Sequence, residues 1–223
     1  LKQHGYKLLV FKGVNAGVGA VSATWLTIEG HDLYDQSSIN INWTEKFNIG
    51  ESATSLQSGA FITGSNPLGK SVDVGKRYTY LGDTWNTNPG TSLDPATFEI
   101  VNKPHMKNSF YVQQHPGSTM NSSPSNPYIV LQEILGNDGN ASFEPLETVS
   151  MFLTTENVKV GTLMIKASSS GAIVSLSGAQ GEAEIAYDQN DGWSGPSAVF
   201  SELTTKDPIY ESMRMSASLA KVA

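Results

Sequence analysis

The sequence predicts an all-β fold: an antiparallel β-sandwich of about twelve strands with a short C-terminal helix. Apolar and polar residues alternate with a period of two along most of the chain, and helical spacing is almost absent. Turn-forming clusters, such as those at 64–67, 88–90 and 136–139, separate the alternating runs. A chain of 223 residues is long enough to bury a large core, and the absence of cysteine excludes a disulfide scaffold.

The first strands are predicted by their alternation and by their content of β-forming residues. Residues 6–11 form an apolar run, and 18–29 is rich in branched and aromatic residues. Ile39, Ile41 and Trp43 alternate with polar residues, which predicts a strand with these three side chains on one face. The same criteria predict further strands at 59–63, 72–74, 78–80, 96–101, 109–113, 128–134, 148–154, 157–166, 171–176 and 182–187.

Local signals predict one hairpin and one helix. Asp138-Gly139 between two apolar runs is typical of a hairpin turn. Near the C-terminus, Pro208 suits a first helical position, and apolar residues follow at helical spacing. We therefore expect a helix from about Pro208 to Lys221 that covers one end of a sheet.

We expect a single domain over residues 1–223. The segment 114–126 has two prolines and no periodicity, which indicates either a long surface loop or a linker between two smaller sandwiches. Both readings remain open at this point.

The charge distribution argues against nucleic-acid binding. The net charge is −7, and residues 111–223 carry all of the excess negative charge. No run of basic residues is longer than the pair Lys76-Arg77, whereas a nucleic-acid binder needs clustered cations to displace counterions from phosphate. We expect no nucleic-acid partner; a homodimer is a possible assembly.

Compartment signals are few. No stretch approaches the roughly 20 apolar residues of a membrane-spanning helix. Asn42, Asn121 and Asn140 begin Asn-x-Ser/Thr sequences, which become glycosylation acceptors only in a secreted protein. We expect a soluble protein, either extracellular or cytoplasmic, with secretion slightly favoured.

Catalytic motifs are scarce, and we predict a protein that is not an enzyme. There is no cysteine nucleophile and no Gly-x-Ser-x-Gly elbow. Residues 64–71 have phosphate-loop spacing, but a strand-like run follows where that loop requires a helix. The enzymatic alternative rests on His31, Asp32 and Asp35, which could act as acid and base or bind a metal ion.

Two tryptophans in turn-rich segments are the best ligand-binding candidates. Trp85 and Trp193 lie beside small amide and carboxylate groups, an arrangement that lets a ring stack on a flat ligand while its edge is hydrogen-bonded. Asp83, Asn86 and Asn190 are the predicted hydrogen-bonding partners.

Asp188 and Asp191 could also hold a single calcium or magnesium ion, because hard cations prefer oxygen ligands. The alternative is a solvated turn with no cation. No other cofactor is predicted, apart from a possible non-covalent small organic ligand.

The chain as a whole is cysteine-free, acidic, rich in serine, threonine, asparagine and glycine, and has tryptophans flanked by asparagine. In this overall composition it resembles the soluble β-sandwich proteins of mushroom fruiting bodies, which include lectins and a pink pigment-binding protein. The resemblance covers no residue motif, and it implies ligand binding rather than catalysis. A carbohydrate ligand is our first hypothesis, a small conjugated organic molecule such as a pigment the second, and a membrane-active β-rich toxin the third.

Overall fold

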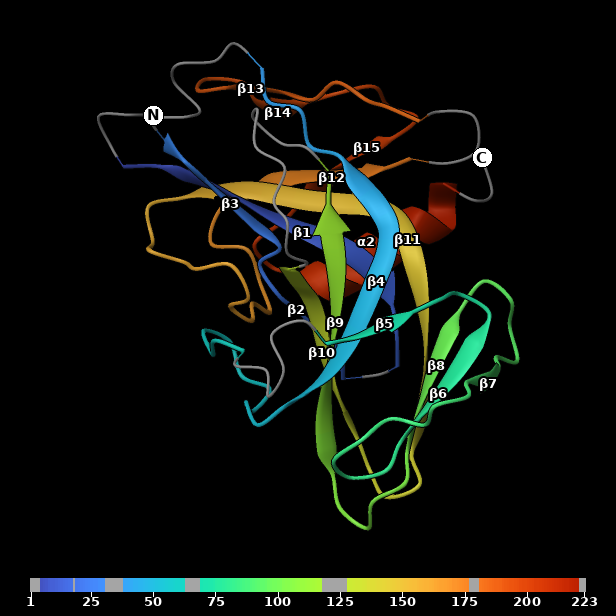
Figure 1. The fold of residues 1–223 in the computed structure, drawn as a ribbon. Coiled ribbons are helices and arrows are strands. Elements are labelled where there is room, and N and C mark those ends of the chain that lie inside the picture. Colours follow the sequence, from blue (N-terminus) through green and yellow to red (C-terminus); the bar gives the residue numbers. More distant parts are fainter. Residues whose placement is uncertain are drawn as a thin grey trace.

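The computed structural model describes residues 5–17, 19–30, 38–62, 69–117, 128–176 and 181–220, which contain fifteen strands and the C-terminal helix (Figure 1). The strands are β1 (Lys7–Asn15), β2 (Val21–Ser22), β3 (Leu26–Glu29), β4 (Trp43–Ser52), β5 (Lys70–Val72), β6 (Lys76–Tyr80), β7 (Gly90–Thr91), β8 (Phe98–Asn102), β9 (Asn108–Pro116), β10 (Tyr128–Leu135), β11 (Asn140–Thr154), β12 (Gly171–Ser175), β13 (Ala186–Asp188), β14 (Gly192–Ser194) and β15 (Phe200–Leu203). The helix is α2 (Ile209–Ala220).

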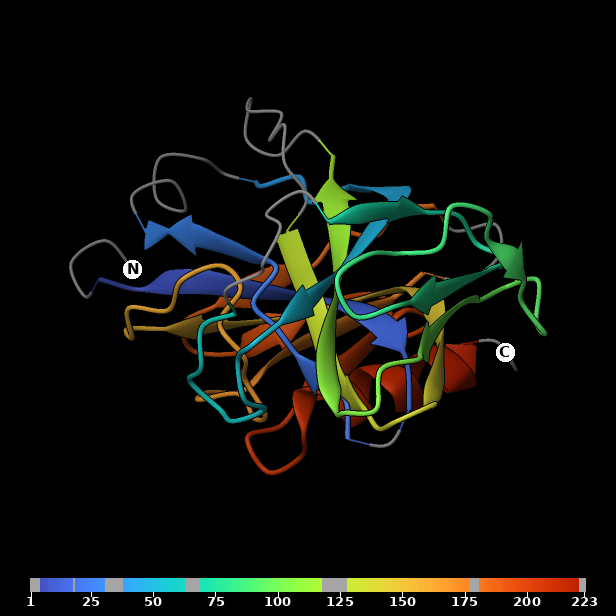
Figure 2. The same ribbon diagram turned by 60° about the horizontal axis from the view of Figure 1, so that its bottom comes forward.

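Most strands belong to one of two sheets, as Figures 1 and 2 show from two directions. The first sheet has eight strands: β15, β12, β11, β8, β6 and β7 follow one another, while β1 pairs with β11 and with β3. The second has five strands in the order β2-β10-β9-β4-β5. Apart from the parallel pair β6–β8, the ladders among the described residues are antiparallel. The predicted all-β sandwich with a C-terminal helix is confirmed.

The main core lies between the two sheets. Leu8 and Val10 of β1 pack in the same cluster as Ile49 of β4 and Val112 of β9. Alternation explains this arrangement, because every second residue of a strand points to the same face. Removal of these apolar side chains from water is the largest favourable contribution to the packing of one sheet on the other.

Strand β1 is buried on both of its faces. Leu9 and Phe11 point away from the main core and pack with Phe152 of β11 and with Ile209 and Met213 of α2. The helix therefore covers the outer face of the first sheet, as its spacing predicts. Because both faces of β1 are covered between Leu8 and Val14, a polar side chain in this part of the strand has no direct route to water.

Five predicted strands have most of their described residues outside the observed strands: 39–43, 59–63, 72–74, 157–166 and 182–187. In the run 39–43, only Trp43 belongs to a strand, although Ile39 and Ile41 still pack against the main core. The described residues 59–62 meet the segment 157–166 at the isolated bridge Phe61–Thr162. Their chain path is set by backbone hydrogen bonds rather than by a ladder: Gly161, at φ +84°, donates to the Thr24 carbonyl at 2.7 Å.

The turn at Asp138-Gly139 exists, but it does not join a hairpin. Asp138 has φ +51°, and the Gly139 amide donates to the Gly136 carbonyl at 3.0 Å. The turn leads from β10 in the second sheet to β11 in the first, so the chain changes layers here. Local turn chemistry predicts a reversal of the chain, and it does not determine which strands then pair.

Part of the possible linker at 114–126 lies outside the described residues, which leave out 118–127. On either side of it, β9 and β10 are antiparallel neighbours, with Leu131 opposite Val112.

Candidate functional site

Trp85 packs into an aromatic cluster at one end of the molecule. Its ring centre lies 5.2 Å from that of Tyr80 and 5.8 Å from that of Phe110. The side chain is half-buried and packs against the main core. Trp85 is therefore held by contacts with two other aromatic rings and with the main core.

The polar neighbours of Trp85 are also engaged or exposed. Asn86 accepts a hydrogen bond from the Thr79 amide at 2.8 Å and donates to the Asn88 carbonyl at 2.6 Å, so its amide group shapes the loop. Asp83 is exposed. Burial raises the pKa of the nearby Tyr80 hydroxyl, and its hydrogen bond to Glu51 and the charge of Asp83 raise it further.

Trp193 lies on the hairpin β13–β14, directly opposite Tyr187. The two ring centres are 5.1 Å apart, and the ring planes are inclined by 56°. The indole N–H of Trp193 donates to the Ser170 carbonyl at 3.1 Å, which fixes the orientation of the ring. Tyr187 is 41% exposed, whereas Trp193 is half-buried and packs against the main core, so Tyr187 is the exposed member of the pair. We call Tyr187 and Trp193 the hairpin platform.

The turn of the same hairpin carries the other predicted polar residues. Asp188 accepts hydrogen bonds from the amides of Asn190 at 2.7 Å and Asp191 at 3.2 Å. These backbone hydrogen bonds lower the pKa of Asp188, so its carboxylate stays ionised. All three side chains are exposed. Asp188 thus holds the turn and is also hydrogen-bonded by the Asn190 side chain, and Asn190 and Asp191 lie between the two platform residues in the chain.

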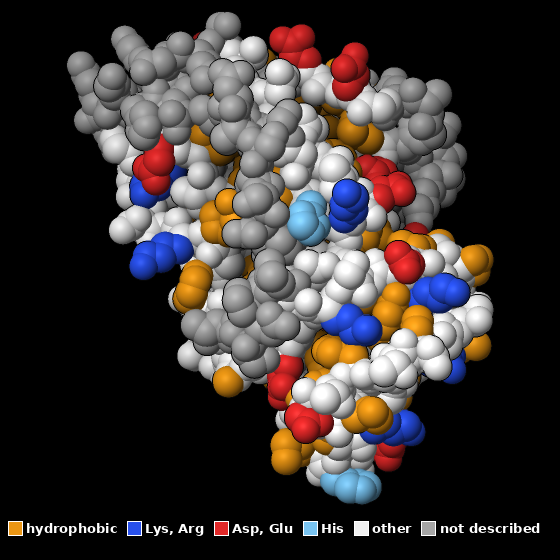
Figure 3. Space-filling model, in the orientation of Figure 1, with side chains coloured by type: hydrophobic (Ala, Val, Ile, Leu, Met, Phe, Trp, Pro, Cys, Tyr) orange, Lys and Arg blue, Asp and Glu red, His pale blue; other side chains and the backbone are white. Residues whose placement is uncertain are grey.

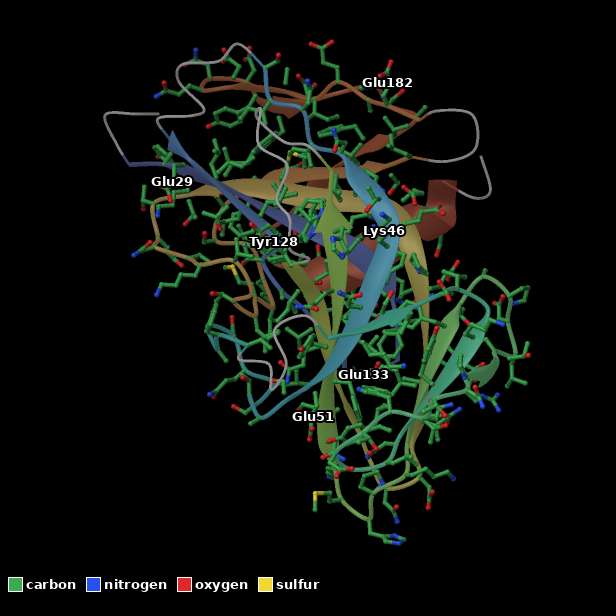
Figure 4. The ribbon with its side chains drawn as sticks, in the orientation of Figure 1. Glu29, Lys46, Glu51, Tyr128, Glu133 and Glu182 are labelled. Atoms are coloured by element: carbon green, nitrogen blue, oxygen red, sulfur yellow. The ribbon has the colours of Figure 1, made fainter. Side chains whose placement is uncertain are left out.

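The two predicted tryptophan sites are not brought together. The hairpin β13–β14 lies at the top of Figure 1 and β6 at its lower right. Figure 4 shows the same separation by two labelled residues. Glu182 lies shortly before β13, and Glu51 accepts a hydrogen bond from Tyr80 of the Trp85 cluster; the two lie far apart in this view. Trp193, Asp188, Asn190 and Asp191 share one hairpin; Trp85, Asp83 and Asn86 share a different loop.

Within the described part of the chain, no group of three or more His, Asp or Glu residues could hold a metal ion. Asp188 and Asp191 alone fall short of such a group, and a cation there stays a prediction. Asn42 and Asn140 are exposed. His31, Asp32, Asp35 and Asn121 lie outside the described residues.

A further cluster was missed by the sequence analysis, and its centre is Lys12. This side chain is only 1% exposed, and its amino group donates to the Leu146 carbonyl. The amino nitrogen lies 4.7 Å from the ring centre of Trp43, in a cation–π contact. Burial lowers the pKa of Lys12 to about 8, although the charge of Glu147 acts in the opposite direction. Trp43 donates its indole N–H to Glu147 at 2.6 Å.

A sequence signal for this cluster exists. Lys12 follows Leu8 and Val10 at intervals of two, so it shares their face of the strand, and that face is the main core. The signal is hard to use, because a lysine at the end of an apolar run is also typical of a strand that emerges into solvent.

Comparison with known proteins gives no further guidance: no protein family, no curated protein and no solved structure matches the chain. Across the described residues, every helix is too short or too polar to span a bilayer. Acidic and basic side chains are interspersed on the face drawn in Figure 3, and the described residues form no continuous basic surface there.

Proposed function

We propose that the protein is a non-enzymatic carbohydrate-binding protein and that the hairpin platform is its binding surface. The observation that carries the proposal is the exposed Tyr187 ring beside a Trp193 ring whose orientation is fixed by Ser170. The apolar face of a pyranose ring stacks on such aromatic surfaces, and its hydroxyl groups take directional hydrogen bonds at the edge.

Polar groups that can serve these hydroxyls lie on the same hairpin. The side chains of Asn190 and Asp191 are exposed at the turn. Their backbone amides donate hydrogen bonds to the Asp188 carboxylate. Pre-positioning of the turn reduces the entropy that binding would otherwise cost. A site of this kind is shallow and open, so affinity for one sugar is low and gains from multivalent presentation.

The test is a panel of free monosaccharides and disaccharides, monitored by saturation-transfer NMR and then by titration of the sugars that bind. We expect Tyr187→Ala to weaken binding of such a sugar by roughly tenfold, equivalent to ~1.4 kcal/mol. Trp85→Phe is the matched control: it changes the other predicted tryptophan, and binding should be unaltered.

Circular dichroism and thermal unfolding establish that both variants remain folded. If no sugar in the panel binds, or if Tyr187→Ala and Trp193→Phe both leave binding unchanged, the proposal is overturned. Loss of binding in Trp85→Phe alone would transfer the site to the Tyr80–Phe110 cluster and would also overturn it.

A further inference from the structure

The Lys12 cluster is separate from the hairpin platform and has a chemistry of its own. Lys12 points into the main core from β1, beside the bulge that shifts the register between Lys12 and Val14. The Leu146 carbonyl accepts one of the three N–H donors of a protonated amine. Burial of a cationic amine is unfavourable, so a polar role would account for a lysine at this position.

The aromatic ring in contact with this amine is that of Trp43, 4.7 Å from the amino nitrogen. Trp43 is the first residue of β4, and the pairing of β4 with β9 is irregular between Trp43 and Phe47. The ring is half-buried, and its N–H is bonded to the exposed Glu147. Trp43 is therefore held by one surface hydrogen bond and by packing on Trp25 and the main core, while its backbone pairs only at the end of the β4–β9 ladder, so movement of its ring leaves the rest of that ladder in place.

The surroundings beneath Trp43 are fixed. Trp25 is fully buried, its ring centre lies 6.5 Å from that of Trp43, and its N–H donates to the Gln114 carbonyl at 3.2 Å. The side-chain oxygen of Gln114 is buried and has no hydrogen-bond partner among the described residues. Outward movement of Trp43 would thus leave a flat, indole-sized space between Trp25 and the Lys12 amine.

We propose that Lys12 is an imine-forming residue, and that a planar aromatic aldehyde occupies the space that Trp43 fills in this structure. The neutral amine nitrogen of Lys12 adds to the carbonyl carbon, and a proton moves from nitrogen to oxygen to give a carbinolamine. Loss of the hydroxyl group with the second amine proton releases one water and forms the C=N bond. No oxidant or reductant is needed.

The ionisation of the amine supports this chemistry. With a pKa of about 8, about half of the Lys12 side chains are neutral at pH 8, whereas an ordinary lysine is less than about 1% neutral at that pH. Only the neutral amine is a nucleophile. Lys12 therefore has an advantage over exposed lysines once the aldehyde has reached it.

The experiment uses a hydroxynaphthaldehyde, a planar bicyclic aldehyde close to indole in size, whose imines absorb visible light. The whole protein is incubated with a substoichiometric amount at pH 8, reduced with borohydride and analysed by intact mass and peptide mapping. We expect a single adduct, on Lys12. Lys12→Met should abolish the imine absorbance, whereas Lys46→Met, which removes an exposed lysine of β4 (Figure 4), should leave it unchanged.

Trp43→Ala tests the position of the ligand. We expect it to increase the rate of imine formation several-fold while the adduct stays on Lys12. Should the adduct form on exposed lysines with Lys12 unmodified, or should Trp43→Ala fail to accelerate the reaction, the proposal is overturned. The peptide map of the unaltered protein decides the matter even if Lys12→Met does not fold.

Discussion

Replacement of Lys12 by methionine is expected to stabilise the protein at neutral pH. Methionine has a similar length and no charge, so it fills the same part of the core. The pKa of Lys12 falls from 10.5 to about 8 on folding. At about 1.4 kcal/mol per pKa unit, this shift means that the charged amine costs about 3 kcal/mol at pH 7. Methionine leaves the Leu146 carbonyl without this donor, a loss of about 1–2 kcal/mol, so we expect a net gain of about 1–2 kcal/mol.

The pH dependence has a definite sign. Because the pKa of Lys12 is lower in the folded protein, the unfolded chain binds more protons between pH 8 and 10.5, and stability of the unaltered protein rises across this range. The variant lacks this contribution. The stability of Lys12→Met relative to the unaltered protein, as a free energy of unfolding, should therefore fall by about 2 kcal/mol between pH 7 and pH 9.5.

Urea unfolding of both proteins at these two pH values measures the difference, and Lys46→Met is the control for loss of an exposed lysine. Titration of other groups cancels in the comparison. A stability difference that stays constant or grows as pH rises would refute the reasoning, because it would show that the buried amine carries no charge penalty.

Three further outcomes are expected. Glu99→Gln should destabilise the protein by about 2–3 kcal/mol in urea unfolding, because the buried Glu99 carboxylate accepts a hydrogen bond from Arg77 at 2.6 Å. Burial alone raises the pKa of Glu99, but hydrogen bonds from Leu93, Arg77 and Ser92 lower it overall. The loss of stability should therefore vanish as pH falls through that lowered pKa. Gly50→Ala should cost about 1–3 kcal/mol, since a Cβ there would lie 2.2 Å from the buried Tyr111 hydroxyl; unchanged thermal stability would contradict this. Asp188→Ala should weaken sugar binding with the melting temperature retained, and unaltered affinity in NMR titrations would exclude a role for the turn.

The sequence predicts the elements whose signal is local. Alternation identifies β1 and most other strands, and helical spacing of Ile209 and Met213 identifies α2. It fails where pairing depends on distant residues: the run 39–43 alternates, yet it is mostly outside the ladders. The parallel pair β6–β8 is likewise a property of the whole topology.

The candidate site shows the same limit. The turn residues around Trp193 are adjacent in sequence, so their grouping is predictable. Packing of Trp85 on Phe110 joins residues from separate segments and has no local signature. The position of Lys12 depends on both faces of β1 being covered, by the second sheet and by α2, which no single segment reveals.

The pairing of β1 with β11 also has a consequence for biosynthesis. Lys12 precedes Leu146 by 134 residues, so a growing chain presents β1 to the cell before its partner has been made. At ~5–20 residues per second, the wait lasts roughly 7 to 27 seconds. Strand β3 can close one edge of β1 early, since Leu8 pairs with Ile28. The other edge has no partner until β11 has been made, and an unpaired edge with apolar residues is a predicted site of aggregation.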